Sequence, residues 1–562
     1  MLSIDNWGKE KMKHAIACLA VVMLMITSVA AVTGKQTQPT TPQPTRETDW
    51  WTMMRHDSGN TGSTTSSAPD TDQLKWQTNI LEPITFTAPL VANNHLYLNT
   101  NSYLFLNPPH NRTLQPPTID PLKILQPTQS YQGSIDCLDT KTGAMQWKRT
   151  FYQPNTPVYL DNKLYFTDFN INAYQGNLYC LNASTGADIF THAVNGIGTS
   201  PTITANGKLY YATIDITSYG GDINCADTSG NTLWSYTLPA YQWSFSAPAV
   251  DTNNVYVLTF NVYSYYTGSL ICLNANTGAY KWSHTVGNLF FYLQQSNLAT
   301  CSDGKVYFTD FNLGSYNTYI RCFDGNTGST LWSYPLVNSV ALMPPSISDG
   351  SVFVSATDMT TYLNSLLRIS ATDGTLQWAT PTPLSGALSG FTICSADKVY
   401  MTTGGLYYAD SVSAFDKTTG QYLWNHFLST EMYGTPAIAS NILFLTDFNG
   451  GVYAYADQLT ITSVHGGLLK ASVVLTNTGN NTFTNVAWHL TVTGGLLGMI
   501  SKDGNGTIPS ITPGQRTTVS IGPLFGLGAI KFNATITPPG SVALTRHLNG
   551  TILGPLIILK HS

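Results

Sequence analysis

The chain has 562 residues, of which 12% are aromatic and only 10% are charged, and its net charge is −5. This length exceeds one ordinary domain unless a repeat array extends it. So few cations exclude a basic nucleic-acid-binding surface. The many neutral polar residues favour an exported, strand-rich protein.

The first 34 residues predict a signal peptide or a signal-anchor. Lysines precede an apolar run of 18 residues, 15–32, and Ser28-Val29-Ala30 offers a small-residue cleavage site. The run is at the lower limit for crossing a bilayer, so cleavage and retention both stay open. Either outcome predicts an extracellular or cell-surface protein that meets a membrane only through this segment, if it is uncleaved. Residues 35–48, rich in Thr, Pro and Gln, predict a linker.

Residues 49–457 repeat one short phrase: a strand, an Asp or Asn, a Thr-Gly or Ser-Gly turn, and an aromatic residue. From the second copy onward the aromatic positions are 43 to 50 residues apart. They are Trp76, Trp147, Phe190, Trp234, Trp282, Trp332, Trp378 and Trp424. A period of about 45 residues with four short strands is typical of a β-propeller blade. Glycine permits the turn, and we expect the aromatic ring to pack between neighbouring blades.

The ends of the repeat array complement each other. Seven units contain four predicted strands, whereas the last unit, residues 435–455, contains three. An isolated strand around Trp76 can supply the fourth and leave no open sheet edge. The sequence therefore predicts an all-β fold with an eight-bladed propeller whose last blade is closed by the N-terminal strand.

After residue 457 the repeat stops. Segments that alternate apolar and polar residues then predict a small immunoglobulin-like β-sandwich over residues 458–562. This module has six Lys or Arg and one acid, Asp503. Such a bias suits an acidic surface or polymer, or is simply a solvated face.

The cysteines follow the repeat. One equivalent strand position in five successive units holds Cys137, Cys180, Cys225, Cys272 and Cys322. Equivalent positions in neighbouring blades lie too far apart for a disulfide and do not converge on a metal. We expect buried, apolar, unpaired thiols and no metal site.

The phrase over residues 135–147 resembles the PQQ-like repeat of quinoprotein β-propellers, and residues 51–57 resemble the segment that precedes the first strand in such proteins. The stretch Asn477-Thr478-Gly479-Asn480 is similar to immunoglobulin-like modules of archaeal and bacterial surface proteins. The first resemblance implies either a quinone-dependent alcohol or sugar dehydrogenase, or a non-catalytic scaffold. We letter the four predicted strands of each unit A to D in chain order. In the enzymes, the cofactor and Ca²⁺ lie on the face made by the loops from strand D to the next strand A (D–A loops) and from strand B to strand C (B–C loops).

The sequence favours the non-catalytic branch. Seven D–A loops, between residues 151 and 436, carry one charged residue, Glu431. A cofactor with three carboxylates needs cations around it, and a general base needs a carboxylate or histidine. We therefore predict no enzyme activity, no cofactor and no catalytic residue. The quinoprotein dehydrogenase stays as the alternative, and a structural component of the cell envelope as a second one.

The same face is rich in aromatic and amide side chains, which suit a glycan or a protein surface. Candidate ligand-face residues are Gln153, Tyr241, Gln242, Trp243, Phe291, Tyr292, Gln295, Glu431 and Tyr433, and tyrosines of the B–C segments, including Tyr219 and Tyr362, adjoin them. Simple packing of these loops is the other interpretation. The sequence thus predicts a cell-surface binding or scaffold protein with a protein or glycan partner and no nucleic acid.

Overall fold

A computed structural model describes residues 50–82, 84, 88–100, 132–170, 173, 175–262, 267–287, 298–312, 317–385, 388–404, 410–428, 432, 434–478, 482–538 and 543–560. These residues form β-strands and one 3-10 turn, which confirms the all-β class. Within these ranges, no helix is long and apolar enough to cross a membrane. The predicted leader and linker lie outside the described residues.

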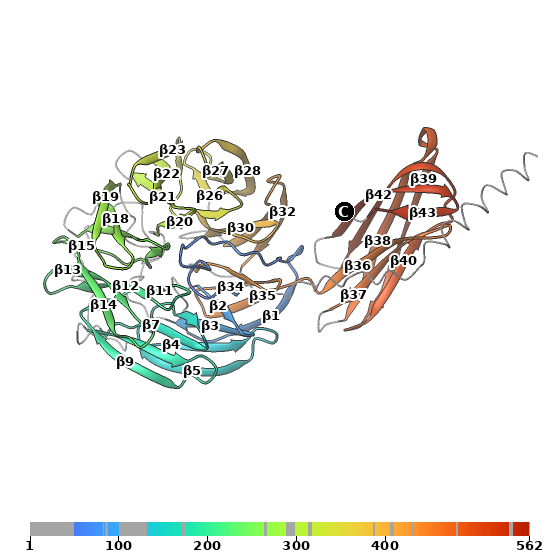
Figure 1. Ribbon diagram of the computed structural model, residues 1–562. Helices are drawn as coiled ribbons and strands as arrows, with labels where there is room; N and C mark the ends of the chain where they lie inside the picture. The colour runs from blue at the N-terminus through green and yellow to red at the C-terminus, as the bar shows by residue number, and fades with distance from the viewer. Residues whose placement is uncertain are drawn as a thin grey trace, which may run out of the picture. The chain divides into compact units, whose positions relative to one another are not determined.

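The described residues before 457 form eight sheets of four or five strands, which are the blades of the propeller (Figure 1). Blades 1 to 4 contain β2 (Leu90–Ala92), β3 (His95–Thr100), β4 (Gln132–Asp139) and β5 (Met145–Tyr152); β6 (Val158–Leu160), β7 (Lys163–Thr167), β8 (Gly176–Asn182) and β9 (Asp188–Val194); β10 (Ile197–Gly198), β11 (Thr202–Ile203), β12 (Leu209–Asp215), β13 (Gly220–Ala226) and β14 (Thr232–Thr237); and β15 (Gln242–Trp243), β16 (Ala249–Val250), β17 (Asn254–Asn261), β18 (Gly268–Asn274) and β19 (Tyr280–Val286). Blades 5 to 8 contain β20 (Thr300–Ser302), β21 (Lys305–Asn312), β22 (Asn317–Asp324) and β23 (Thr330–Leu336); β24 (Ser339–Val340), β25 (Ser346–Ser348), β26 (Ser351–Asp358), β27 (Leu363–Ser370) and β28 (Leu376–Ser385); β29 (Leu388–Cys394), β30 (Lys398–Gly404), β31 (Ser411–Asp416) and β32 (Tyr422–Phe427); and β33 (Ala437–Ala439), β34 (Ile442–Thr446), β35 (Gly451–Tyr455) and β1 (Leu74–Asn79).

Burial within a blade falls from the inner strands to the outer one. β3 is buried along almost its whole length, whereas β5, the outer strand of the same blade, alternates between exposed and half-buried residues. The inner strands lie between two neighbouring blades and therefore need apolar side chains on both faces. The outer strand meets solvent, and its sequence shows the period-two pattern of a half-buried strand.

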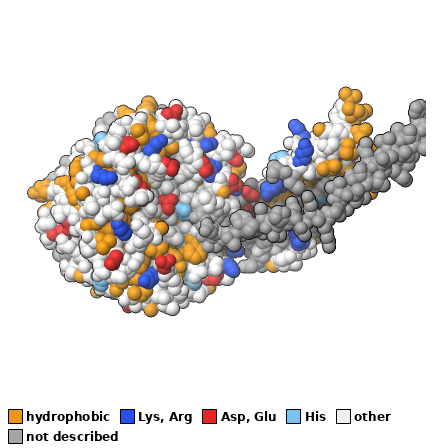
Figure 2. All heavy atoms as spheres, in the orientation of Figure 1, with side chains coloured by type: hydrophobic (Ala, Val, Ile, Leu, Met, Phe, Trp, Pro, Cys, Tyr) orange, Lys and Arg blue, Asp and Glu red, His pale blue; other side chains and the backbone are white. Residues whose placement is uncertain are grey.

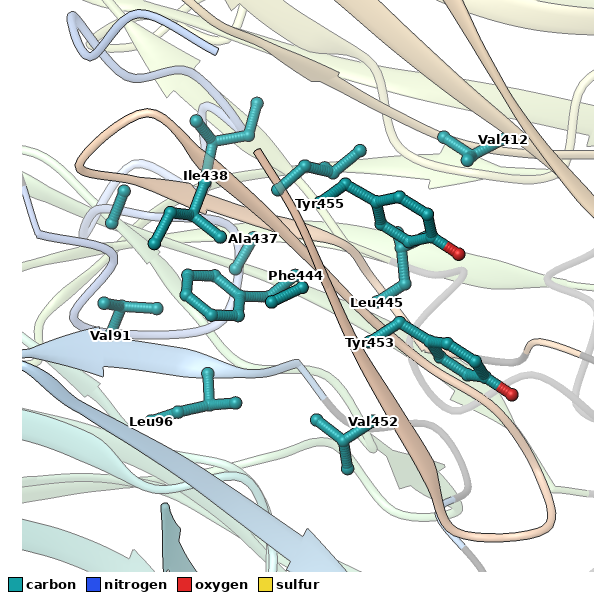
Figure 3. Packing of buried hydrophobic residues seen from close by; sticks show 14 of the residues in the cluster. Val91, Leu96, Val412, Ala437, Ile438, Phe444, Leu445, Val452, Tyr453 and Tyr455 are labelled. Carbon is teal, nitrogen blue, oxygen red and sulfur yellow. The ribbon is translucent and has the colours of Figure 1, made fainter. Parts of the chain in front are cut away.

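The last blade closes with the N-terminal strand, as the sequence predicted. β1 pairs antiparallel with β35, from Leu74 opposite Tyr455 to Asn79 opposite Gly451. Phe444 and Val452 of this blade belong to one buried cluster that also contains residues of blades 1 and 7 (Figure 3). Burial of this shared cluster, together with the strand pairing, joins the two ends of the repeat array.

The repeat phrase makes a turn whose polar groups satisfy one another. The Asp139 carboxylate accepts hydrogen bonds from the backbone amides of Lys141 and Thr142 and from the Thr142 hydroxyl, at 2.8–3.0 Å. The same pattern recurs at Asp324 and Asp416. The turn is therefore encoded locally, by an acid that accepts from the amides two and three residues ahead.

The aromatic residue of the phrase connects each blade to the next. Six indole N–H groups donate to a backbone carbonyl in the following blade, at 2.9–3.2 Å: Trp76 to Thr140, Trp147 to Ala183, Trp234 to Ala275, Trp282 to Gly325, Trp332 to Ala371, and Trp378 to Thr418. The turn glycine of that following blade lies against the same ring. Phe190 lacks the N–H, and His192 beside it contacts the Gly230 carbonyl instead. The prediction that the aromatic rings pack between blades is confirmed.

Gly374 should tolerate alanine poorly, because its φ is +75° and an added Cβ would lie 2.7 Å from the Trp332 ring. Gly350 of the same blade has a φ of +66° and open space around it, so it is a matched control for backbone strain alone. We expect Gly350→Ala to cost about 1 kcal/mol and Gly374→Ala about 1–3 kcal/mol more. Urea unfolding of both variants measures the difference. Equal costs would contradict the close packing of glycine on the ring.

The described cysteines are all buried and free, as predicted. Burial raises the pKa of the Cys137 thiol to about 12. A thiol that stays protonated at neutral pH is a poor nucleophile and a poor metal ligand. These residues therefore fill the blade interior.

The C-terminal module is a sandwich of two sheets. One contains β36 (Leu459–Gly466), β37 (Ala471–Asn477) and β40 (Arg516–Ile521). The other contains β39 (Ile500–Ile511), β38 (Phe483–Gly494), β41 (Gly526–Thr537), β42 (Leu544–Gly554) and β43 (Leu556–Leu559), and the turn η2 (Leu496–Gly498) joins β38 to β39. Alternate residues of both sheets form a single buried cluster. The immunoglobulin-like type of this sandwich stays a prediction.

Candidate functional site

The candidate ligand face is formed by the connections that follow the outer strand of each blade and those between its two middle strands. Four of the predicted residues, Gln153, Tyr241, Gln242 and Trp243, are described by the structure. The other five lie outside the described residues: Phe291, Tyr292, Gln295, Glu431 and Tyr433. The four described residues lie in the connection from blade 1 to blade 2 and in the connection from blade 3 to blade 4, its short strand β15 included.

Trp243 does not present a ring to solvent. It is 4% exposed and belongs to a buried cluster with Ile214, Phe260 and Val262. Its indole lies parallel to the Tyr219 ring, with centroids 6.3 Å apart. For this residue the packing interpretation of the aromatic loops applies.

Tyr241 is the exposed member of the group, at 42%. Its amide donates to the Tyr219 carbonyl at 3.1 Å, and the two rings lie 6.3 Å apart at 51°. Both tyrosines have positive φ angles, 66° and 55°, which non-glycine residues adopt rarely. Trp243 thus supports Tyr219, and Tyr219 supports an accessible Tyr241. Tyr362 lies in the connection between β26 and β27 of blade 6, which corresponds to the connection that holds Tyr219, and it is also exposed.

The two amide candidates are buried or half-buried. The Gln242 side-chain oxygen accepts from the Thr259 hydroxyl at 2.8 Å, which fixes its orientation beside the aromatic group. Gln153 is buried, with a φ of 41°.

One acid of this face, Glu82, was not predicted, because it lies in the connection from β1 to β2, outside the seven loops taken as D–A loops. Its carboxylate contacts the Lys148 ammonium at 2.5 Å. It also accepts from the hydroxyls of Thr100 and Ser134 at 2.8 and 3.0 Å. Asp136 lies beside them and is fully buried. Neither of its carboxyl oxygens has a hydrogen-bond partner among the described residues, and Oδ2 is 3.9 Å from the Lys148 ammonium. Burial raises the pKa of Asp136 to about 6.

Three acids at the ends of second strands are engaged internally. Asp168 accepts from the Asn177 amide and the Tyr179 hydroxyl, both at 2.8 Å, and burial raises its pKa. Asp310 accepts from the Gly287 amide and pairs with Arg321 at 2.5 Å. Asp447 accepts from two backbone amides of its own turn and from a tyrosine hydroxyl. All three acids therefore already have internal partners, and Asp447 caps its own turn. The described residues contain no group of three metal-ligating side chains.

The centre of the ring is occupied by the chain itself. Residues 51–66, blue in Figure 1, accept hydrogen bonds from the amides of inner strands in six of the eight blades. The pairs are Val91 to Trp51, Tyr159 to Thr52, Val250 to Ser58, Cys301 to Gly59, Ile347 to Thr61, and Cys394 to Gly62, at 2.6–2.9 Å. The inner edge of each sheet would otherwise carry unpaired amides into the channel. This central segment satisfies them in chain order around the ring.

Arg55 lies at the core of this central segment and is fully buried. Its guanidinium donates to the carbonyls of Asn60, Pro345 and Thr392 and to the Ser346 hydroxyl, at 2.8–3.4 Å. Burial lowers its pKa to about 10. The guanidinium is therefore charged at neutral pH, but it is committed to groups of this chain.

The described site does not fit a quinone with three carboxylates. Such a ligand would need accessible cations on the face, yet the central cation, Arg55, is buried against backbone carbonyls. Arg321 and Lys148 are each paired with an acid. What the described face offers a ligand is a projecting tyrosine on a rigid aromatic base.

The sequence matches a known protein family over most of the propeller. A family described as "Outer membrane protein assembly factor BamB" matches residues 127–192, 175–314 and 293–505. No curated protein matches the chain.

Solved structures with a similar fold have low sequence identity. BamB from Moraxella catarrhalis is 14% identical, with 68% of this chain and 99% of that chain covered and a TM-score of 0.46. Quinohemoprotein alcohol dehydrogenase from Comamonas testosteroni is 14% identical, with 75% and 82% covered and a TM-score of 0.49. A europium-containing methanol dehydrogenase is 12% identical, with 77% and 91% covered and a TM-score of 0.49. Together the three matches cover residues 127–505 without a gap, which is more than half of the chain, so the chain belongs to the PQQ-like β-propeller family that is described as outer membrane protein assembly factor BamB.

Proposed function

We propose that this protein is an exported, non-enzymatic binding or scaffold protein, whose propeller face binds a glycan or a protein at the cell surface. The observation that carries the proposal is the pairing of an accessible Tyr241 with a buried aromatic base, Tyr219 and Trp243. A tyrosine held in one orientation loses little entropy on binding and offers both a ring face and a hydroxyl. Export and surface location rest on the N-terminal sequence.

The channel supports the same proposal. A catalytic propeller needs an accessible pocket with charged groups that are free to act on a substrate. Here the central segment pairs with the inner strands around the channel, and the buried acids at the strand ends already accept hydrogen bonds from backbone amides of the propeller. The family also contains oxidoreductases, so quinone-dependent dehydrogenase activity is the alternative to be tested.

Tyr241→Ala should weaken ligand binding about tenfold or more, because a central aromatic contact commonly carries that share of an interface. Binding is measured on a glycan array and by pull-down from cell envelopes. Tyr280→Ala is the matched control, since Tyr280 is 52% exposed on an outer strand of blade 4. We expect the control to bind like the unaltered protein.

Two outcomes contradict the proposal. Saturable dye reduction with alcohols or sugars, in the presence of Ca²⁺ and the quinone, would assign the protein to the dehydrogenases. Co-fractionation with the envelope, without a glycan or protein partner, would indicate a structural component instead.

A further inference from the structure

One end of the C-terminal sandwich exposes a group of apolar side chains. It is formed by the connections at residues 467–470, 494–499, 522–527 and 553–556. We name as the apolar tip the residues Leu468, Leu496, Leu497, Met499, Phe525 and Leu527, and Figure 2 shows hydrophobic side chains gathered at this end. Leu497 is 90% exposed, Met499 81% and Phe525 73%. Side chains of this size are rarely left in water together unless a partner covers them.

Backbone contacts make these connections one surface. The Leu469 amide donates to the Pro555 carbonyl at 2.6 Å, and the Leu524 amide donates to the Leu469 carbonyl at 2.8 Å. The Gly495 amide donates to the Ala529 carbonyl at 2.6 Å, which joins the turn before η2 to β41. The exposed side chains are therefore held together by the fold.

The charges around the tip are positive. None of the four connections contains an acid, and Lys470 lies within one of them. Lys531 is opposite Thr493 and Lys502 is opposite Val492, each within two residues of the end of β38. The one acid of the module, Asp503, is further from the tip and contacts His489 at 2.8 Å.

We propose that the apolar tip inserts into the surface of a bilayer that contains anionic lipids. Its leucines and methionine project from glycine-containing turns at the narrow end of the sandwich, a shape that acyl chains can surround. Lysines placed just behind an apolar tip meet the phosphates of the headgroups when the tip is inserted. A protein partner would instead be matched by polar groups among the apolar ones, and the four connections carry no polar side chain other than Lys470. This adds a membrane contact to the one expected from the N-terminal segment.

The test uses residues Asp49–Ser562, which form one compact unit without the apolar N-terminal run. Sedimentation with phosphatidylcholine vesicles, with and without phosphatidylglycerol, measures binding. Leu497→Asp combined with Met499→Asp removes two tip side chains. The control combines Leu81→Asp with Val337→Asp, since these propeller residues are 86% and 80% exposed and the added charge is the same. Thermal unfolding verifies that both variants remain folded.

We expect binding to the anionic vesicles that falls at least about tenfold in the tip variant, because each buried leucine contributes about that factor. The control should bind like the unaltered chain, and vesicles without phosphatidylglycerol should bind more weakly. Absence of vesicle binding, or binding unchanged in the tip variant, would overturn the proposal. A dimer that the tip variant abolishes, without vesicle binding, would assign the tip to a second copy of the chain.

Discussion

Replacing Trp332 with alanine is expected to lower the free energy of unfolding of the propeller by about 3–5 kcal/mol. The ring is buried between blades 5 and 6, its N–H donates to the Ala371 carbonyl at 3.2 Å, and the backbone of Gly374 lies against it. Alanine removes all three contacts and leaves a cavity that both blades line. Urea unfolding followed by circular dichroism measures the loss.

Trp332→Phe separates the ring from its hydrogen bond. Phenylalanine retains most of the buried area but removes the indole donor from the Ala371 carbonyl, which still accepts from the Lys305 ammonium at 2.9 Å. The lost hydrogen bond should cost about 1 kcal/mol or less. The natural copy at Phe190 shows that a blade accepts this aromatic. If Trp332→Ala lowered the free energy of unfolding no more than Trp332→Phe, packing of the aromatic side chain between blades would not be what stabilises the propeller.

Asp136→Asn is expected to raise stability at about pH 7 by up to about 3 kcal/mol and to leave it unchanged at about pH 4. The Asp136 carboxyl is fully buried, and burial raises its pKa from 3.8 to about 6. The folded state therefore binds this proton more tightly than the unfolded state. Stability from this group is greatest below about pH 4, falls as the pH rises to about 6, and stays reduced above it.

The difference in the free energy of unfolding between the unaltered protein and Asp136→Asn isolates this carboxyl group, because all other carboxyl groups titrate in both proteins. Unfolding is measured at several pH values from about 4 to 7. Asparagine is nearly isosteric and uncharged, and nearby Glu82 keeps its contact with Lys148. A constant difference across this range would mean that the carboxyl does not titrate as its burial requires.

The sequence predicts the fold of this protein well because its signals are local. The Asp139 turn, with glycine four residues on, recurs with little change, and the strands between turns alternate in apolar and polar residues. The unmatched strand at Trp76 was sufficient to predict its pairing with β35. These features depend on neighbours along the chain and so can be read from it.

The site is less predictable because exposure depends on residues far apart in sequence. Nothing local distinguishes Trp243, which is buried, from Tyr241, which is exposed two residues earlier. The position of the central segment could not be predicted from its residues, because 51–66 show no strand periodicity; only the resemblance of residues 51–57 to the segment before the first strand of quinoprotein propellers marked it. Arg55 is the residue that could have pointed to the buried position of this segment. Its hydrogen-bond partners Pro345 and Thr392 lie about 300 residues away, however, and so could not be read from the local sequence.

The central segment also sets an order for folding. Its residues are synthesised first, yet Gly62 pairs with Cys394, and Thr71 next to β1 pairs with Asp457 across 386 residues. The backbone hydrogen bonds of this early segment, and the burial of the apolar side chains of β1, therefore form only when the last blades are present. Such distant pairings make folding slow and place its completion after the whole propeller is available. The ring of blades therefore closes late, because the pairings that seal it join the first strand of the propeller and the residues before it to the end of the last blade.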